Sequence, residues 1–339
     1  MYIENNIIKK QISTWLLLML FLIALIIIVG GLTRLTDSGL SITKWELFSG
    51  TLPPLSENQW MYYFDQYKLI PEFKIQNSLM TIGEFKFIFW WEWAHRFLGR
   101  LIGICFLIPL IYFSLREKFE NLINLHFIFL LICLQGFIGW YMVSSGLVNR
   151  VDVSHFRLSL HLTIAFIILS LILWQILKYK NVYKNSDHFI KYSLPSIFLF
   201  LIYLQIIFGA FVSGMDAGKI YNTWPLMGNN YFPDDNSFNH IFSIDALSDP
   251  SLVQFIHRNL AYLIMLVFLL ISILVINGKM TRFYNIIKII GVILFFQIFL
   301  GILTILTGAQ MLFASMHQIS SIILVSFSIY FLFLNKKIN

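Results

Sequence analysis

The sequence predicts an all-α polytopic membrane protein whose eight transmembrane helices form two pseudo-symmetric four-helix bundles. Of its 339 residues, 58% are apolar and 12% are charged, whereas about 25% of the residues of a soluble domain are charged. Eight apolar runs are each close to the roughly 20 residues that a helix needs to cross a bilayer. Characteristic residues also recur at fixed spacings in both halves of the chain, which indicates an internal duplication.

The eight expected helices follow one another in two sets of four. They lie near residues 15–32, 90–114, 122–143, 158–177, 192–213, 256–276, 286–306 and 314–334. The first run is too long to be a cleaved signal peptide, and Gly30-Gly31 at its end leads directly into a motif, so we keep it as the first helix. We divide the chain into an N-terminal module, residues 1–180, and a C-terminal module, residues 181–339.

The basic residues are distributed by membrane side. They gather at the two termini and in alternate short connections: Lys9, Lys10, Arg116, Lys118, Lys178, Lys180, Lys184, Lys191, Lys279, Arg282, Lys288, Lys336 and Lys337. The positive-inside rule therefore puts both termini in the cytoplasm. The net charge of +7 requires no nucleic-acid partner, because the cations form no single patch.

This topology leaves two long outer loops, residues 33–89 and 214–255. The loops are related, because four residues recur at a displacement of 179: Gly30, Asp37, Gly39 and Trp45 correspond to Gly209, Asp216, Gly218 and Trp224. Both loops contain turn-forming prolines and several aromatic residues. We expect them to form ordered caps at the outer membrane interface, where Trp and Tyr are favoured.

Four histidines occupy matching places in the two modules. His95 and His161 are 66 residues apart, His257 and His317 are 60 apart, and all four are expected in the first turn or two of inward-running helices, near the outer face. An ionisable residue in a span marks a functional site by default, although one histidine alone is equally well a contact between helices. The fourfold repetition favours metal ligation. Two imidazoles per module suit axial heme ligation better than zinc, which needs three or four protein ligands.

Other residues between and beyond these pairs are weaker candidates. Gln135, Gly139 and Gly146 recur as Gln297, Gly301 and Gly308, each displaced by 162 residues. The glycines Gly136, Gly139, Gly209 and Gly301 suit close approach of a helix or a macrocycle, but helix packing alone explains them. His126 is expected near the cytoplasmic start of a span, His188 in a cytoplasmic link, and His155 and His240 in outer loops. All four are expected to be solvated or to pack. Cys105 and Cys133 fall in spans and are expected to pack as small apolar side chains.

Glu92 breaks the symmetry of the repeat, because Gln254 holds the equivalent position. It precedes His95 by three residues and therefore shares a helix face with it. Glu92 can be an ordinary interfacial charge, a partner that orients the imidazole, or a proton donor or acceptor whose pKa is tuned by partial burial. We favour the functional interpretations, since only one module has the carboxylate.

An arginine follows one ligand histidine of each module, namely Arg96 and Arg258. Guanidinium groups bind carboxylates such as heme propionates in a forked geometry. Snorkelling to lipid headgroups is the alternative. Further arginines expected near outer helix ends are Arg34, Arg100, Arg150 and Arg157. Arg96 and Arg258 are the favoured propionate contacts, because they occur at equivalent positions in both modules.

Together these residues resemble the heme A synthase family. The motifs that carry the resemblance are the run Gly30–Ser41, Glu92-x-x-His95-Arg96, Gln135-Gly136-x-x-Gly139-Trp140, the run Tyr221–Met227, His257-Arg258 and Met316-His317-Gln318. The resemblance covers essentially the whole chain. The long first loop and the lack of loop cysteines are similar to the proteobacterial and mitochondrial branch, so the loop disulfide of the other branch is not carried over.

The resemblance implies oxidation of the C8 methyl of heme O to a formyl group by successive hydroxylations, with a redox cofactor carrying the hard chemistry. It assigns His257 and His317 to a resident heme b, and His95 and His161 to the heme O substrate. Glu92 is then expected to be catalytic, beside the reacting heme.

The implied surroundings are a bacterial inner membrane and its lipid, an unidentified electron donor, heme O synthase, cytochrome oxidase assembly factors and a homo-oligomer. Two other functions stay open. A diheme electron-transfer cytochrome is disfavoured because all four ligands are expected at one face. A heme carrier without chemistry is disfavoured because only one half has Glu92.

Overall fold

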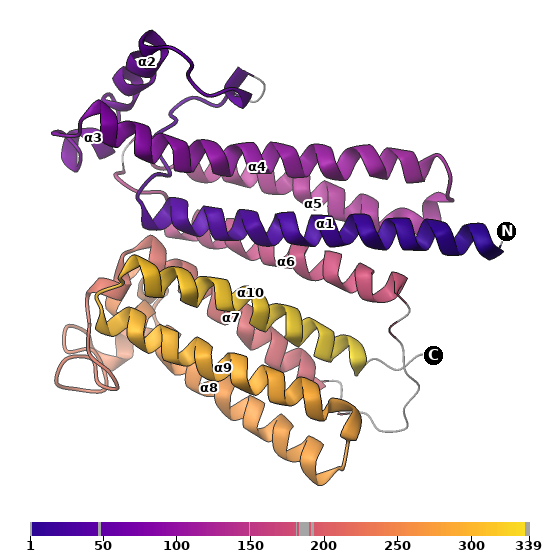
Figure 1. The fold of residues 1–339 in the computed structure, drawn as a ribbon. Helices are drawn as coiled ribbons and strands as arrows, with labels where there is room; N and C mark the ends of the chain where they lie inside the picture. The colour runs from indigo at the N-terminus through magenta and orange to yellow at the C-terminus, as the bar shows by residue number, and fades with distance from the viewer. Residues whose placement is uncertain are drawn as a thin grey trace. The chain divides into compact units, whose positions relative to one another are not determined.

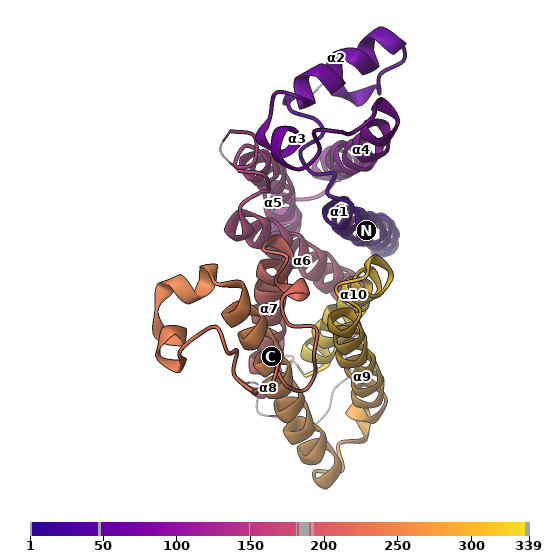
Figure 2. The ribbon, with the colours of Figure 1, turned by 90° about the vertical axis from the view of Figure 1, so that its left-hand side faces the viewer.

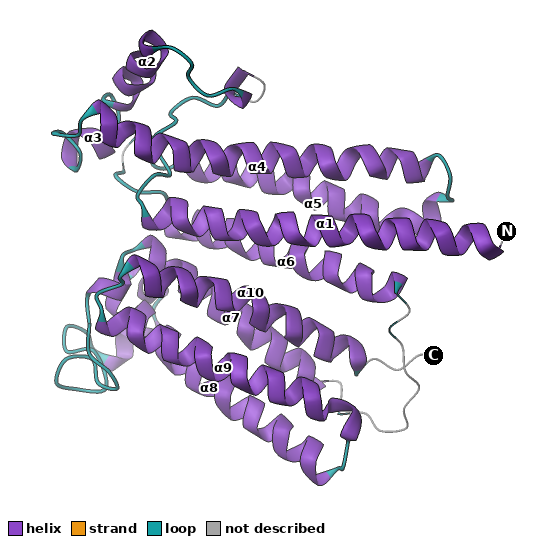
Figure 3. Cartoon of the chain, in the orientation of Figure 1, coloured by secondary structure: helices purple, strands orange, loops and turns teal. Residues whose placement is uncertain are grey.

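The computed structural model describes residues 2–46, 49–148, 150–180, 182, 190 and 193–335. His188 and the basic residues Lys184, Lys191, Lys336 and Lys337 lie outside these residues. The described chain is helical and contains no strand (Figure 3). Eight of its helices are long and apolar enough to cross a membrane, which confirms the predicted fold class.

The eight long helices are labelled in Figure 1. They are α1 (Tyr2–Leu35), α4 (Ile82–Ser114), α5 (Phe119–Val143), α6 (His155–Tyr179), α7 (Ser193–Gly214), α8 (Pro250–Asn277), α9 (Tyr284–Leu306) and α10 (Met311–Leu334). The shorter elements are α2 (Glu57–Tyr67), α3 (Pro71–Ile75) and the 3₁₀ helices η1 (Ser49–Thr51), η2 (Ala217–Lys219), η3 (Phe238–Phe242), η4 (Ile244–Ser248) and η5 (Thr281–Phe283).

Contacts between residues divide the chain into two compact units, which we describe separately. The first unit is Phe21–Ile168, and the second combines Met1–Leu20 with Leu169–Asn339. Both boundaries fall inside long helices, α1 and α6. The division of the sequence repeat at residue 180, and the pairing of its helices into two bundles, stay predictions.

In the first unit, α4 begins about two turns before the predicted start of its span. Thr81 begins the helix with a capping box: its side chain accepts a hydrogen bond from the amide of Glu84, whose carboxylate accepts one from the amide of Thr81. Such reciprocal bonds satisfy amides that the first helical turn leaves unpaired. The prediction began later because Glu84 and Lys86 interrupt the apolar run.

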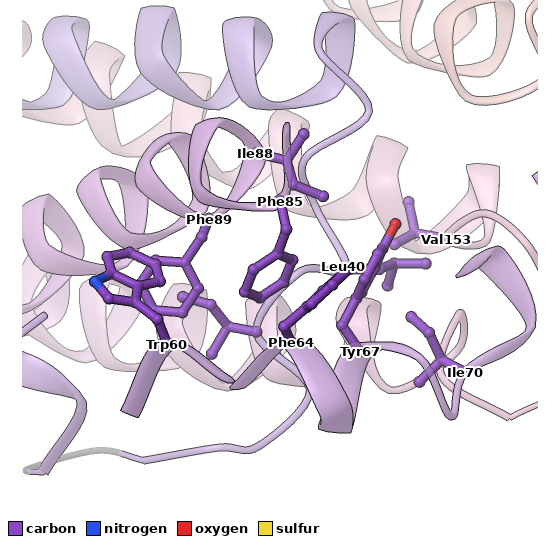
Figure 4. Packing of buried hydrophobic residues seen from close by; sticks show 10 residues of the cluster. Leu40, Trp60, Phe64, Tyr67, Ile70, Phe85, Ile88, Phe89 and Val153 are labelled. Carbon is purple, nitrogen blue, oxygen red and sulfur yellow. The ribbon is translucent and has the colours of Figure 1, made fainter. Parts of the chain in front are cut away.

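The extra turns of α4 complete a hydrophobic core in the first loop (Figure 4). This core consists of Leu40, Ile42, Trp60, Phe64, Tyr67, Ile70, Phe85, Ile88, Phe89 and Val153. Trp60 of α2 meets Phe89 of α4 edge-to-face, with ring centroids 5.0 Å apart. Such aromatic pairs add stability beyond the burial of their area. Because Leu40 and Ile42 belong to the core, the segment that follows α1 is held against α4.

In the second unit, α7 packs on α8 and on α10, and α9 packs on α10. Figure 2 shows these four helices nearly end-on. Phe198, Ile264, Ile271, Ile290 and Val325 are among the buried side chains of this unit. Its loop contains 3₁₀ helices in place of α-helices. α8 starts after Asp249, whose carboxylate accepts a hydrogen bond from the amide of Leu252.

Candidate functional site

The first predicted ligand pair lies together in the first unit. The rings of His95, from α4, and His161, from α6, have centroids 6.3 Å apart and planes at 69°. Both side chains are half-buried. Their Nδ1 atoms are buried and have no hydrogen-bond partner among the described residues. His95 lies deeper in its helix than expected, because α4 begins at Ile82.

The second pair lies in the second unit, with His257 on α8 and His317 on α10, within electrostatic range of each other. The Nδ1 of His317 lies 3.0 Å from the backbone oxygen of Gln297. A carbonyl only accepts hydrogen bonds, so Nδ1 carries the proton and Nε2 is the nitrogen left for a metal. The described residues bring no three His, Cys, Asp or Glu side chains together. The described residues of each module could therefore offer a metal two imidazoles, and no third side chain of these types.

Each of the four imidazoles rests against a glycine of a neighbouring helix. A Cβ atom added to the glycine would approach Cε1 of the ring to 2.8 Å at Gly30 and His95, 3.0 Å at Gly139 and His161, 3.2 Å at Gly209 and His257, and 3.0 Å at Gly301 and His317. These separations are too short for any other residue unless the ring moves. Gly136 differs, because a Cβ there would meet nothing within 4 Å.

A glutamine precedes three of these glycines by four residues and binds the same ligand histidine. The amide nitrogen donates to the histidine's backbone oxygen from Gln135 to His161 at 3.0 Å, from Gln205 to His257 at 3.0 Å and from Gln297 to His317 at 3.1 Å. In α1 the equivalent residue is Ile26. No side chain within the described ranges donates to the backbone oxygen of His95.

Glu92 is 3% exposed and accepts four hydrogen bonds. Its Oε1 accepts from Arg96 Nε at 3.0 Å and Nη2 at 2.6 Å, forming an ion pair within one helical turn. Its Oε2 accepts from the hydroxyl of Ser41 and the amide of Ile42, each at 2.7 Å. Glu92 makes no hydrogen bond to His95 in the described part of the chain. The carboxylate therefore joins α4 to the first loop.

The second unit repeats this contact with different chemistry. Gln254 donates its amide to the backbone oxygen of Tyr221 at 3.1 Å. Arg258 donates to the backbone oxygens of Tyr221 at 2.9 Å, Thr223 at 2.9 Å and Leu226 at 3.2 Å. In both units, the arginine after the ligand histidine thus holds the outer loop through carbonyl groups.

These contacts bear on the predicted propionate contacts. Arg96 donates to the backbone oxygens of Ile42 at 2.7 Å and Lys44 at 3.1 Å, besides its bonds to Glu92. Arg258 keeps a buried Nε that has no partner within the residues described. Holding the loop is a role that the sequence pattern does not distinguish from propionate binding, because both use a guanidinium beside the ligand.

The remaining described histidines and Arg157 make contacts of other kinds. His126 packs on Phe119 and contacts the backbone oxygen of Leu122 through Nδ1 at 3.0 Å. His155 begins α6 and is buried, so the expectation that it belongs to an outer loop is wrong. His240 contacts the side chain of Asn236 at 2.9 Å. Arg157 stacks on the ring of Tyr141. Neither Cys105 nor Cys133 forms a disulfide.

The first loop contains a second buried carboxylate, which the sequence analysis did not predict. Glu72 is 4% exposed and accepts a hydrogen bond from the hydroxyl of Tyr67 at 2.8 Å. Burial raises the pKa of Glu72 to about 8, although the Tyr67 hydrogen bond lowers it. Near the Glu92–Arg96 pair, Glu46 accepts a hydrogen bond from Tyr63. Burial, followed by this bond, raises the pKa of Tyr63 to about 12.

The chain is similar in sequence to known proteins along nearly its whole length. Residues 13–329 match the family described as "Cytochrome oxidase assembly protein". The chain is 46% identical over 347 aligned positions to a protein named Heme A synthase from Pelagibacter ubique (strain HTCC1062), covering all of both chains.

Rickettsial proteins of the same name are also similar. The one from Rickettsia bellii (strain RML369-C) is 42% identical over 328 positions, covering 95% of this chain and 97% of its own. The one from Rickettsia felis is 40% identical over 334 positions, covering 97% and 99%. On this evidence the chain belongs to the heme A synthase family.

Proposed function

We propose that this protein oxidises the C8 methyl of heme O to a formyl group by successive hydroxylations, using a resident heme b. The observation that supports this function best is the buried Glu92 in one module only, one helical turn from His95. A binding protein without chemistry has no use for a carboxylate at one of two equivalent positions. Membership of the heme A synthase family supplies the reaction class.

The residues present fit a heme in each module. Each module offers two imidazoles and no third ligand within the described chain, which is the donor set of a bis-histidine heme. His317 presents Nε2, because its Nδ1 is hydrogen-bonded to a carbonyl. The glycine beside each ring leaves room for the imidazole against the neighbouring helix. His257 and His317 would hold heme b, and His95 and His161 would hold heme O.

A bound heme b supplies the redox chemistry that no side chain can perform on an unactivated methyl group. The chain's own residues orient the substrate and manage protons. Glu92 Oε2 is the atom at which a proton is held or released. Its contact with the Ser41 hydroxyl at 2.7 Å is the one bond to Glu92 whose partner can both donate and accept. Arg96 balances the charge of Glu92 in its buried position.

The proposal extends to the setting of the protein. We place it in a bacterial inner membrane with both termini in the cytoplasm and the ligand histidines toward the outer face. Hydroxylation requires an oxidant and an external electron donor, neither of which is identified by side-chain chemistry. Heme O synthase, cytochrome oxidase assembly factors and further copies of this chain are candidate partners.

Extraction of pigments from the purified protein, followed by chromatography, tests the function. We expect heme B together with heme O, its hydroxylated form or heme A. Heme B as the sole pigment, in a preparation from cells that make heme O, would contradict the proposal and favour an electron-relay cytochrome.

A further inference from the structure

The four ligand histidines are held with unequal firmness. His317 is the most constrained: Gln297 binds its backbone oxygen, its Nδ1 donates to the backbone oxygen of Gln297, and Ser320 donates to the side chain of Gln297. The backbone oxygen of His257 likewise accepts a hydrogen bond from the amide of Gln205.

The N-terminal pair is held less firmly. Among the residues described, His161 has the hydrogen bond from Gln135 to its backbone oxygen and no other side-chain contact of this kind. His95 has no such contact within the described residues, since Ile26 replaces the glutamine and its Cδ1 points toward Gly99 instead. The histidines assigned above to the resident heme are thus both anchored, and those assigned to the substrate are anchored on one side.

Helix packing alone does not account for these glutamines. Oε1 of Gln135 and Oε1 of Gln205 are buried without a partner in the described chain, and an unpaired buried acceptor is unfavourable. An apolar side chain, such as Ile26 in α1, would pack without this cost. In all three cases the amide nitrogen reaches the backbone of the ligand itself, one turn along the helix from the glycine that backs its ring.

We infer that Gln205 and Gln297 are positioning residues that retain the resident heme, and that Ile26 in place of a third such glutamine lets the N-terminal module exchange its heme. The inference rests on the proposed function for the names of the two hemes. Partners that orient a ligand without touching the metal change metal affinity by about 10–100-fold when removed. A module that takes up a substrate and releases a product needs at least one helix with a ligand histidine that can move.

Heme loss from the purified, pigment-loaded protein measures this retention. Excess apomyoglobin is added in mild detergent as the heme scavenger, and the pigments left on the protein are separated by chromatography at successive times. Heme O and heme A should leave before heme B. Gln297→Met and Gln205→Met keep the side-chain length but remove the donor, and each should speed the loss of heme B by about tenfold.

The N-terminal module offers a matched pair of variants at one position. Ile26→Gln should slow the loss of heme O and heme A severalfold, while Ile26→Met should leave it unchanged, because only the first can donate to the backbone oxygen of His95. Loss from the other module is the internal control, since a variant that merely destabilises the fold would speed both. Equal rates for Ile26→Gln and Ile26→Met, or unchanged heme B loss in both glutamine variants, would overturn the inference.

Failure of the proposed function has a different signature. If the protein carries heme B in both modules, His95→Ala removes one phase of heme B loss and His317→Ala the other. A fast phase that His95→Ala removes, slowed by Ile26→Gln, would support the inference although the synthase assignment had failed. A fast phase that His317→Ala removes would contradict the inference.

Discussion

Each module holds its long loop through two equivalent helix positions, but only the first module has a carboxylate at one of them. In the first, Glu92 pairs with Arg96 and accepts hydrogen bonds from Ser41 and Ile42. In the second, Gln254 and Arg258 donate to loop carbonyls, and no carboxylate takes part. An amide therefore suffices to hold a loop in this frame. The proposal gives the carboxylate of the first module a second purpose, in proton transfer.

The largest expected effect is the loss of heme b ligation in the second module. His257→Ala or His317→Ala should abolish the low-spin bis-histidine spectrum of heme b, because each removes one of two axial ligands. Optical and electron paramagnetic resonance spectra of the purified protein measure this. His240→Ala is the control, since His240 contacts only loop residues and should keep the spectrum. A heme b spectrum unchanged in both ligand variants would refute the assignment.

Removing the arginines should affect the two modules unequally. Arg96→Ala leaves Glu92 buried without its cation, which costs about 3–5 kcal/mol of unfolding free energy. Arg258→Ala leaves only loop carbonyls unpaired, which costs about 1–3 kcal/mol. Denaturation in mild detergent, followed by tryptophan fluorescence, compares the two. The double variant Glu92→Gln/Arg96→Ala should recover part of the loss; no recovery would show that the ion pair is not the cause.

Replacing the Glu92 carboxylate by an amide tests whether Glu92 serves the reaction or the folding of the protein. Glu92→Gln makes the first module resemble the second, so the protein should fold and keep its heme b. Heme A production should fall by about 10²-fold, the contribution typical of a general acid or base. The ratio of heme A to heme B in membranes measures the change. Gln254→Glu, the reciprocal variant, should not raise production, and normal heme A levels in Glu92→Gln would remove Glu92 from the catalytic machinery.

Two glycines of α5 form a matched pair, because Gly139 lies against the ring of His161 and Gly136 does not. Gly139→Ala forces a methyl group against His161 and should cost about 1–3 kcal/mol while altering ligation by that histidine. Gly136→Ala meets nothing and should stabilise the helix by about 0.5–1 kcal/mol. Unfolding midpoints of the two variants test this. Equal destabilisation would mean that the ring is not held as described.

The last prediction concerns the pH dependence of stability in the two loops. Burial raises the pKa of Glu72 to about 8 from its ordinary 4.5, so the folded first loop binds a proton that the unfolded loop has lost, and its stability falls as pH rises from about 4.5 to 8. Burial also acts to raise the pKa of Asp235, but hydrogen bonds from Ser251 and Tyr221 outweigh it and lower that pKa. The second loop should therefore lose stability only in acid.

Limited proteolysis of each loop against pH measures both trends. Glu72→Gln should remove the dependence of the first loop between about pH 4.5 and 8 and leave the second loop unaffected. A first loop whose protection rises with pH over that range would contradict the stated pKa direction.

The sequence predicted the membrane spans well, because hydropathy directly reflects transfer into lipid. It placed the start of α4 too late, since the decisive signal was the capping box of Thr81 and Glu84 in a charged segment. The rings of His95 and His161, which the repeated spacing pairs as ligands, have centroids 6.3 Å apart. The ligand assignments and the role of Glu92 remain predictions.

Other parts of the site were beyond the sequence patterns used. Gln205 escaped notice because its counterpart in the repeat is Ile26, so no recurrence marked it. Arg96 and Arg258 were seen, but their carbonyl partners come from loop segments without regular periodicity, whose path depends on tertiary packing. Glu72 is isolated in the sequence and becomes buried only through the core around Tyr67.

The glycine behind each ligand ring has a consequence for divergence after the duplication. Every amino-acid replacement of glycine adds at least a Cβ, and at Gly30, Gly139, Gly209 and Gly301 that atom would meet an imidazole. A carboxylate could therefore be exchanged for an amide at position 92 or 254, or a glutamine for an isoleucine, without moving a ring, whereas any replacement of these four glycines requires the imidazole to shift. The differences between the two halves accordingly lie at neighbouring positions, such as Glu92 against Gln254 and Ile26 against Gln205.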